Sequence, residues 1–258
     1  MDAAGAACAA DEADDIITFR DVSLSYGEGD VLDRFNLRVR AGEFLAVVGD
    51  SGSGKTTALK LINGLLRATS GQVCVQGRDI SRLSSAQAIR MRRDIGYVIQ
   101  GVGLFPHLSV LNNILYVPTL KHMKKRDATR RAHELMDLVG LERALLDRHP
   151  RELSGGQRQR VGIARALAAD PRILLMDEPF GAVDAITRAN LQDALQGIHQ
   201  KLKKTVFFIT HDIDEALKLG DRVLVLLDGV IEQLDTPERL LAAPRTEYVR
   251  TLLGSRVR

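Results

Sequence analysis

Residues 45–56 read Leu-Ala-Val-Val-Gly-Asp-Ser-Gly-Ser-Gly-Lys-Thr, so that an apolar run leads directly into a glycine-rich loop. The loop has the pattern Gly-x-x-x-x-Gly-Lys-Thr and precedes a predicted helix over 57–65, the setting in which this pattern binds phosphate. Glycines let backbone N–H groups turn toward phosphate oxygens, and the helix N-terminus adds its dipole. We therefore predict that a nucleotide triphosphate contacts Gly49, Asp50, Ser51, Gly52, Ser53, Gly54, Lys55, Thr56 and Thr57.

Three residues of this loop have distinct expected roles. Lys55 would reach the β- and γ-phosphates, and the Thr56 hydroxyl would bind Mg²⁺. Asp50 is the unusual residue, because a carboxylate that faced the phosphates would repel them. We therefore expect Asp50 to point outward to solvent and assign it no catalytic role.

Three further apolar runs end abruptly at a polar residue, as buried parallel strands do. Residues 95–99 end at Gln100, residues 173–176 at Asp177 and residues 206–210 at His211. Ligands of open α/β sheets sit just beyond the carboxyl ends of the strands. We therefore predict an α/β fold with a mainly parallel sheet, in which the residues at these ends converge on one crevice with the glycine-rich loop.

The segments around this core predict additions to it. Short strand-like segments at 17–20, 22–26 and 35–39 predict a small, partly antiparallel sheet. Residues 101–161 predict an inserted helical subdomain, in which apolar residues at 132, 135, 136 and 139 follow helical spacing between a cap at Asp127 and an end at Gly140. Thr236-Pro-Glu238 predicts a C-terminal helix over about 236–253. Residues 1–15, rich in alanine and acidic residues, predict a disordered tail before a single domain over 16–258.

Composition excludes several classes of protein. The 258 residues carry 36 basic and 33 acidic side chains, and this net charge of +3 is too balanced to indicate a nucleic acid partner. No apolar run approaches the roughly 20 residues of a membrane helix, and the N-terminus lacks the features of a secretion signal. Cys8 and Cys74 are the only cysteines, so we expect no disulfide framework and a reducing, cytosolic compartment.

Two more motifs lie downstream of the loop. Asp177 follows an apolar run, where a carboxylate can bind Mg²⁺ through water, and Glu178 can polarise the water that attacks a γ-phosphate. Leu153-Ser-Gly-Gly-Gln157 precedes a basic helical segment, where Ser154 can cap the helix while the glycines expose N–H groups to a second anion. Two glycine-rich phosphate sites in this order indicate that two copies of the chain close over the nucleotide together.

With their order and spacing, these motifs resemble the ATP-binding subunit of ABC transporters, from about residue 16 to the C-terminus. The resemblance implies a P-loop NTPase core in which Tyr26 stacks on adenine, Gln100 senses Mg²⁺ and the γ-phosphate, and His211 contacts the γ-phosphate. It implies that Gly181-Ala-Val-Asp184 is the D-loop, with valine where leucine is commoner. The residues implied to cover the partner's ATP are Ser154, Gly155, Gly156 and Gln157. The implied catalytic residues are Lys55, Gln100, Glu178 and His211, and the implied Mg²⁺ ligands are Thr56, Gln100 and Asp177.

Within that family, Gly103-Leu-Phe-Pro-His107 and residues 211–222 are similar to bacterial importers of quaternary amines such as glycine betaine, choline and carnitine. The resemblance implies ATP and Mg²⁺ as cofactors and a second ATPase subunit, as a homodimer. It also implies transmembrane permease subunits, to which the chain binds peripherally at the cytoplasmic face of the membrane, and, indirectly, a solute-binding protein. Many ATPases of that group carry paired CBS motifs, which this sequence lacks, so we expect no ionic-strength sensing by that route.

Other functions stay open at this point. The chain can serve an importer of another polar solute (an amino acid, a sulfonate or a polyamine), or an exporter or lipid transporter of similar fold. An ABC ATPase that acts on DNA or ribosomes is disfavoured, because only the 52 residues 101–152 separate Gln100 from Leu153 and one cassette is present. Other subunits choose the substrate, and a solute-binding protein encoded beside this chain would indicate it.

Overall fold

The computed structural model describes residues 8, 14–27, 29–181 and 183–256 of the chain. The chain divides into two compact units. The first unit comprises residues 1–92 and 205–258, and the second unit comprises residues 93–204. The second unit is therefore a continuous insertion in the sequence of the first.

The first unit contains an antiparallel sheet and a mainly parallel sheet. The antiparallel sheet has the order β2-β1-β4-β5, with β1 at Asp15–Ser25, β2 at Asp30–Arg40, β4 at Ser70–Val75 and β5 at Arg78–Asp79. The parallel strands are β3 at Phe44–Val48, β8 at Thr205–Ile209 and β9 at Arg222–Leu227, to which β10 at Val230–Asp235 adds an antiparallel edge. Every residue of β3 and β8 is buried, which explains why they are unbroken apolar runs.

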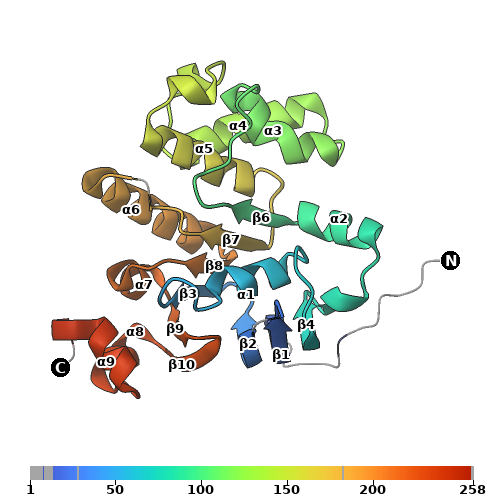
Figure 1. The fold of residues 1–258 in the computed structure, drawn as a ribbon. Helices are drawn as coiled ribbons and strands as arrows, with labels where there is room; N and C mark the ends of the chain where they lie inside the picture. The colour runs from blue at the N-terminus through green and yellow to red at the C-terminus, as the bar shows by residue number, and fades with distance from the viewer. Residues whose placement is uncertain (1–7, 9–13, 28, 182, 257–258) are drawn as a thin grey trace. The chain divides into compact units, whose positions relative to one another are not determined.

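The first unit also contains five α-helices among its described residues. They are α1 at Lys55–Ile62, α2 at Ser85–Arg93, α7 at Ile213–Leu219, α8 at Pro237–Ala242 and α9 at Glu247–Leu253, with short 3₁₀ turns η1 at Ile80–Arg82 and η4 at Gly254–Arg256. Helix α7 packs on β3, and α8 and α9, drawn in red in Figure 1, pack on β10. The C-terminal helices therefore belong to the same unit as the glycine-rich loop.

The second unit combines two parallel strands with a helical cluster. Strand β6 at Ile95–Val98 pairs with β7 at Ile173–Asp177. The helices are α3 at Val110–Leu120, α4 at Lys125–Leu138, α5 at Gly155–Leu167 and α6 at Ala185–Leu202, with 3₁₀ turns η2 at Arg143–Leu145 and η3 at Pro150–Glu152. Helices α3 and α4 pack against α5 (Figure 1), and α5 also packs on β6. Helix α5 extends the predicted helical region beyond residue 161 to Leu167.

Among the helices of the described residues, none is both long enough and apolar enough to cross a membrane.

Several predicted elements differ from the structure at their boundaries. The two strands predicted at 17–20 and 22–26 are one strand, β1, which continues through Asp21 with a left-handed φ of 46° and a shift in register. Helix α4 begins at Lys125, so the predicted cap Asp127 lies in its first turn instead. Gly140 does end that segment in a left-handed conformation, as predicted.

The predicted helix over 236–253 is wrong in its continuity. Thr236 caps its start, since its side chain accepts a hydrogen bond from the Arg239 N–H. The helix then breaks between α8 and α9, where Ala243 adopts φ −144° and ψ 67° ahead of Pro244. A residue before proline is pushed out of helical conformation, and proline lacks the N–H that a helix needs. Thr246 caps the second helix, α9.

The prediction about the cysteines is also wrong. Cys8 and Cys74 form a disulfide, and the Cys8 N–H donates to the Gly77 carbonyl at 3.2 Å. Position 8 is thereby fastened to β4 and the turn after it. Apart from Cys8, Asp14 and Asp15, the predicted disordered tail lies outside the described residues.

Candidate functional site

The glycine-rich loop joins β3 to α1 in the first unit. Gly49, Gly52 and Gly54 have φ values of 155°, 88° and 98°, which glycine adopts at little cost. A side chain is excluded at Gly49 by space as well, because a Cβ there would lie 2.0 Å from the Leu226 carbonyl oxygen. Helix α1 begins at Lys55, two residues earlier than predicted.

Lys55 is folded across this loop and is 6% exposed. Its Nζ donates to the carbonyls of Gly49 at 2.8 Å and Asp50 at 2.6 Å, and to Ser53 Oγ at 3.3 Å. The first turn of α1 contains no acidic residue, and its N-cap, Gly54, offers no side-chain cap. A buried ammonium group at an uncapped helix N-terminus is suited to an anion such as a phosphate.

Metal binding at this loop would need oxygen atoms from a ligand. Nowhere in the described part of the chain do three or more His, Cys, Asp or Glu side chains gather as a metal site. Mg²⁺ is commonly held by one or two protein groups together with substrate phosphates and water. The hydroxyl of Thr56 and the carboxylate of Asp177 are of the type that such a site uses.

His211 follows β8, the parallel neighbour of β3, so it lies at the same edge of the sheet as the glycine-rich loop. The backbone on both sides of it is fixed. The Thr210 hydroxyl donates to Glu215 at 2.5 Å and accepts from the Asp212 N–H at 3.0 Å. Asp212 in turn caps α7 by accepting from the Asp214 N–H at 2.9 Å.

In the second unit, Gln100 and Glu178 meet beyond the ends of β6 and β7. Gln100 Nε2 donates to Glu178 Oε2 at 3.3 Å, although the two residues are 78 positions apart. Glu178 has a φ of 44°, a conformation that is uncommon for a glutamate and frequent at functional sites. Asp177 is buried at the end of β7. The burial of the Tyr97 side chain and, next to it in size, the negative charge of Asp177 raise the pKa of Tyr97 to about 12.

Two residues that no sequence pattern indicated hold the loop after Gln100. Asn113 is fully buried and exchanges hydrogen bonds with the backbone of Phe105, at 2.8 Å and 3.1 Å. Arg165 of α5 donates to the carbonyls of Val102 at 2.9 Å and Gly103 at 2.8 Å. Helix α5, which begins at the Ser-Gly-Gly motif, is thereby joined to the segment that carries Gln100.

The Ser-Gly-Gly motif itself forms a capping box. Ser154 Oγ accepts from the Gln157 N–H at 3.2 Å, and Gln157 Oε1 accepts from the Ser154 N–H at 2.8 Å. The predicted cap by Ser154 is confirmed. A Cβ on Gly156 would lie 2.4 Å from Thr187 Cγ2, so the second glycine is needed for packing. The role of Gly155 and Gly156 toward a partner's nucleotide stays a prediction.

Two further predicted contact residues lie on the surface of the first unit. Tyr26 follows β1 with 63% of its surface exposed, and its stacking on adenine stays a prediction. Asp50 is exposed as expected, but its N–H donates to the Tyr248 hydroxyl at 3.1 Å. Nothing in the sequence near Tyr248 pointed to this contact, because the two residues are 198 positions apart.

The structure thus brings the predicted residues together in two groups. Gly49–Thr56 and His211 share one sheet edge in the first unit, whereas Gln100, Asp177 and Glu178 gather in the second. Convergence of the two groups on one nucleotide stays a prediction.

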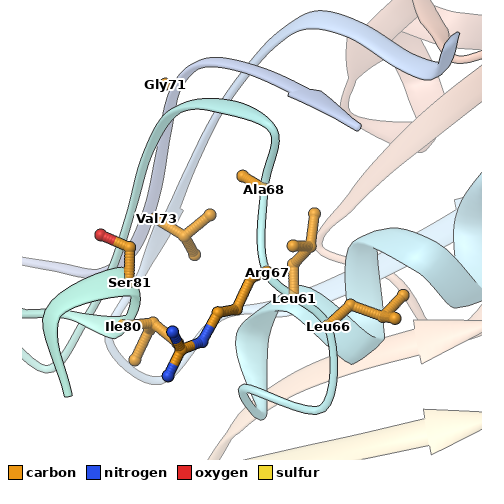
Figure 2. Close-up of a pocket in the computed structure, with 8 residues that line it drawn as sticks. All are labelled: Leu61, Leu66, Arg67, Ala68, Gly71, Val73, Ile80 and Ser81. Carbon is orange, nitrogen blue, oxygen red and sulfur yellow. The ribbon is translucent and has the colours of Figure 1, made fainter. Parts of the chain in front are cut away.

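A hollow elsewhere in the first unit does not compete with the glycine-rich loop as a ligand site. Figure 2 shows its lining, which comes from α1 and the segment after it, from β4 and from η1. The lining is mainly apolar, with Arg67 as its cation, and the space of about 10 Å³ has room for about one water molecule.

Comparisons with known proteins agree on one family. The family model described as ABC transporter matches residues 32–181. The choline transport ATP-binding protein OpuBA of Bacillus subtilis is 44% identical over 93% of this chain and 62% of its own length. The osmoprotectant import ATP-binding protein OsmV of Salmonella typhimurium is 49% identical over 86% of this chain and 58% of its own length. The chain therefore spans about three fifths of the length of these two relatives.

A solved structure is similar as well. The ATP-binding cassette MJ0796, in a dimeric post-hydrolysis state bound to ADP and Pi, has a TM-score of 0.79 and 35% identity. The match covers 86% of this chain and 98% of that one, so almost the whole of that cassette has a counterpart here.

Proposed function

Because the chain belongs to the ABC transporter family, we propose that it is the ATP-hydrolysing subunit of a membrane importer. The cargo that we propose is a quaternary amine osmolyte of the glycine betaine, choline or carnitine type. The observation that carries the hydrolytic part is the Gln100–Glu178 hydrogen bond at the ends of β6 and β7. It places an amide and a carboxylate together in the second unit, and groups of these types position water and Mg²⁺ in triphosphate hydrolysis.

In this proposal each group of residues has one task. Bound ATP with Mg²⁺ supplies the phosphoanhydride bond and a divalent charge that favours its cleavage. The loop from Gly49 to Thr56 binds the phosphates through backbone N–H groups, and Lys55 neutralises their charge. Glu178 orients or deprotonates the attacking water, and Gln100 fixes the position of the Glu178 carboxylate. His211 donates a hydrogen bond to the γ-phosphate.

The proposed partners follow from the signature motif and the relatives. Ser154–Gln157 of one subunit would cover the ATP bound by a second copy, as the dimeric state of MJ0796 supports. Closure of this dimer would move permease subunits at the cytoplasmic face of the membrane. The cargo is supported by the names of the relatives OpuBA and OsmV, which transport choline and import osmoprotectants.

The variant Glu178→Gln tests the hydrolytic proposal. It keeps the shape of the side chain and the contact with Gln100 but removes the carboxylate that acts on water. We expect unchanged ATP affinity, a loss of turnover of about 10²-fold or more, and a dimer that persists with ATP in size-exclusion chromatography. Asp193→Asn on the exposed side of α6 is the matched control. Turnover at the wild-type rate in Glu178→Gln would contradict the role of Glu178.

The same variant tests the cargo in cells that have no other uptake route for glycine betaine. We expect uptake of labelled glycine betaine to cease in cells that carry Glu178→Gln. If cells with the wild-type chain take up no glycine betaine although the purified wild-type chain hydrolyses ATP and Glu178→Gln does not, the cargo is wrong and the hydrolytic proposal stands.

A further inference from the structure

The Tyr248 hydroxyl lies against the second residue of the glycine-rich loop. It accepts a hydrogen bond from the Asp50 N–H at 3.1 Å. Burial raises the pKa of Tyr248, and the negative charge of the nearby Asp50 carboxylate raises it further. A phenol that keeps its proton stays a neutral acceptor for a backbone N–H. One hydroxyl from α9 therefore holds the loop backbone at Asp50.

The helix that carries Tyr248 is fixed. Tyr248 lies in the first turn of α9, which Thr246 caps by accepting from the Val249 N–H. Val249 and Leu253 of the same helix are fully buried. The hydroxyl is thus presented to the loop from a packed element, as positioning a loop requires.

Other contacts from the C-terminal part of the chain support the same loop. The Gly229 N–H, in the turn between β9 and β10, donates to the Ser53 carbonyl at 3.1 Å. The Leu226 carbonyl lies where a side chain at Gly49 would be. Tyr248 differs from these contacts because it holds the loop with a side-chain hydroxyl, whereas the other two are backbone groups.

Arg256 extends the connection to the segment after His211. Its Nε and Nη2 both lie 2.6 Å from the carboxylate oxygens of Asp214, in a bidentate pair. Asp214 is in the first turn of α7, which begins two residues after His211. Residues 247–256 therefore contact the phosphate-binding loop at one end and the helix next to His211 at the other.

We propose that residues 247–256 form a C-terminal clasp that positions the nucleotide site. Tyr248 is the positioning residue that holds the backbone of the loop at Asp50, and Arg256 is the positioning residue that fixes α7 and, through it, His211. The proposal rests on the proposed function, since it assumes that the loop binds ATP.

Tyr248→Phe is the first test, because it removes only the hydroxyl. Titration of the full chain with ATP and Mg²⁺ should show a dissociation constant raised about 3- to 10-fold, the range expected for one hydrogen bond to a charged loop. In the Asp50→Asn background the same change should raise the dissociation constant by a similar factor, since the hydroxyl holds the backbone N–H of position 50 and that group is unchanged. Arg250→Gln, which removes an ion pair with Glu247 inside α9, is the matched control and should not change ATP affinity.

Arg256→Gln tests the other end of the clasp. We expect it to lower kcat about 2- to 5-fold with ATP affinity unchanged, and Asp214→Asn to reproduce this loss without adding to it in the double variant. If Tyr248→Phe does not fold, the double-mutant cycle of Arg256→Gln and Asp214→Asn still tests the clasp by itself.

The outcomes separate the two proposals. Equal ATP affinity of the wild type and Tyr248→Phe, or disappearance of the loss in the Asp50→Asn background, overturns the hold of Tyr248 on the loop backbone. An unchanged kcat in Arg256→Gln overturns that of Arg256. A wild-type chain that binds no ATP overturns the proposed function itself.

Discussion

Asp79 shows what a single buried charge contributes to the first unit. Its carboxylate is 3% exposed and accepts from Gln72 Nε2 at 2.8 Å and from the N–H and hydroxyl of Ser81 at 2.9 Å and 2.6 Å. Burial alone would raise the pKa of Asp79, but these hydrogen bonds and the charge of Arg82 outweigh it and lower the pKa below its ordinary value. The folded chain therefore favours the ionised form.

Because folding lowers the pKa of Asp79, the free energy of unfolding that its carboxylate contributes depends on pH. This contribution is fully present above the unfolded pKa of about 4, and it is lost as the pH falls through the lower pKa of the folded state. We expect Asp79→Asn to lose about 1–3 kcal/mol of unfolding free energy at pH 7, because the new amide faces the donor of Gln72. The loss should shrink below about pH 4, as measured by urea unfolding in pH steps.

The control for this prediction is Asp33→Asn, since Asp33 is half-exposed and pairs only loosely with Arg34, at 3.6 Å. It should change stability by less than about 0.5 kcal/mol. A deficit of Asp79→Asn that stays constant from pH 7 to pH 3 would show that the charge is not the cause.

At the scale of elements, the connection between β6 and α3 depends on one amide. Asn113 Nδ2 donates to the carbonyls of Phe105, Leu108 and Ser109 at 3.0–3.1 Å, and Oδ1 accepts from the Phe105 N–H. The side chain is fully buried, so water cannot replace it. The segment after Gln100 therefore has a fixed shape although it is neither helix nor strand.

Asn113→Ala should lower the unfolding free energy by about 2–4 kcal/mol, because several buried backbone groups lose their partner. Asn112→Ala, at the exposed neighbouring position, should cost less than about 0.5 kcal/mol. Urea unfolding of both variants compares them directly. Similar midpoints for the two would mean that the segment does not depend on the Asn113 amide.

Elements also show where local patterns sufficed and where they did not. The apolar runs predicted β3, β6, β7 and β8, because a strand buried on both faces contains little else. The one helix predicted over 236–253 is two, although Pro244 is visible in the sequence, since the apolar residues on either side continued the pattern. Asp21 likewise shifts the register within β1 without ending the strand.

At the scale of the whole molecule, the Cys8–Cys74 disulfide closes a long loop of chain. The two cysteines are 66 positions apart, and closing a loop of that size removes chain entropy worth about 4 kcal/mol from the unfolded state. Asp15, where β1 begins, lies within the closed loop. The bond therefore fastens the chain upstream of the first strand to the antiparallel sheet of the first unit.

Cys8→Ser should accordingly unfold several degrees below the wild type under oxidising conditions. Cys74→Ser should give the same midpoint as Cys8→Ser, and the double variant should be no less stable than either. Dithiothreitol should bring the wild type to the same value. Two reactive thiols in the oxidised wild type would contradict the bond.

The sequence determined the fold class and the family, and it supplied the predicted site residues, because these depend on local patterns. A glycine-rich loop needs its own glycines, a buried strand needs its own apolar run, and Ser154 caps the helix that it precedes. Gln100, Glu178 and His211 could be predicted as site residues because each lies within two residues of the end of such a strand.

Tertiary structure decided the contacts between residues distant in the chain. The Asp50–Tyr248 hydrogen bond, the Cys8–Cys74 disulfide, and the hold of Asn113 and Arg165 on the loop after Gln100 have no local signature. Each depends on which side chains the packing of separate elements places within bonding distance. The sequence therefore identified the groups that we predict to meet a phosphate, and the packing decided what holds those groups in position.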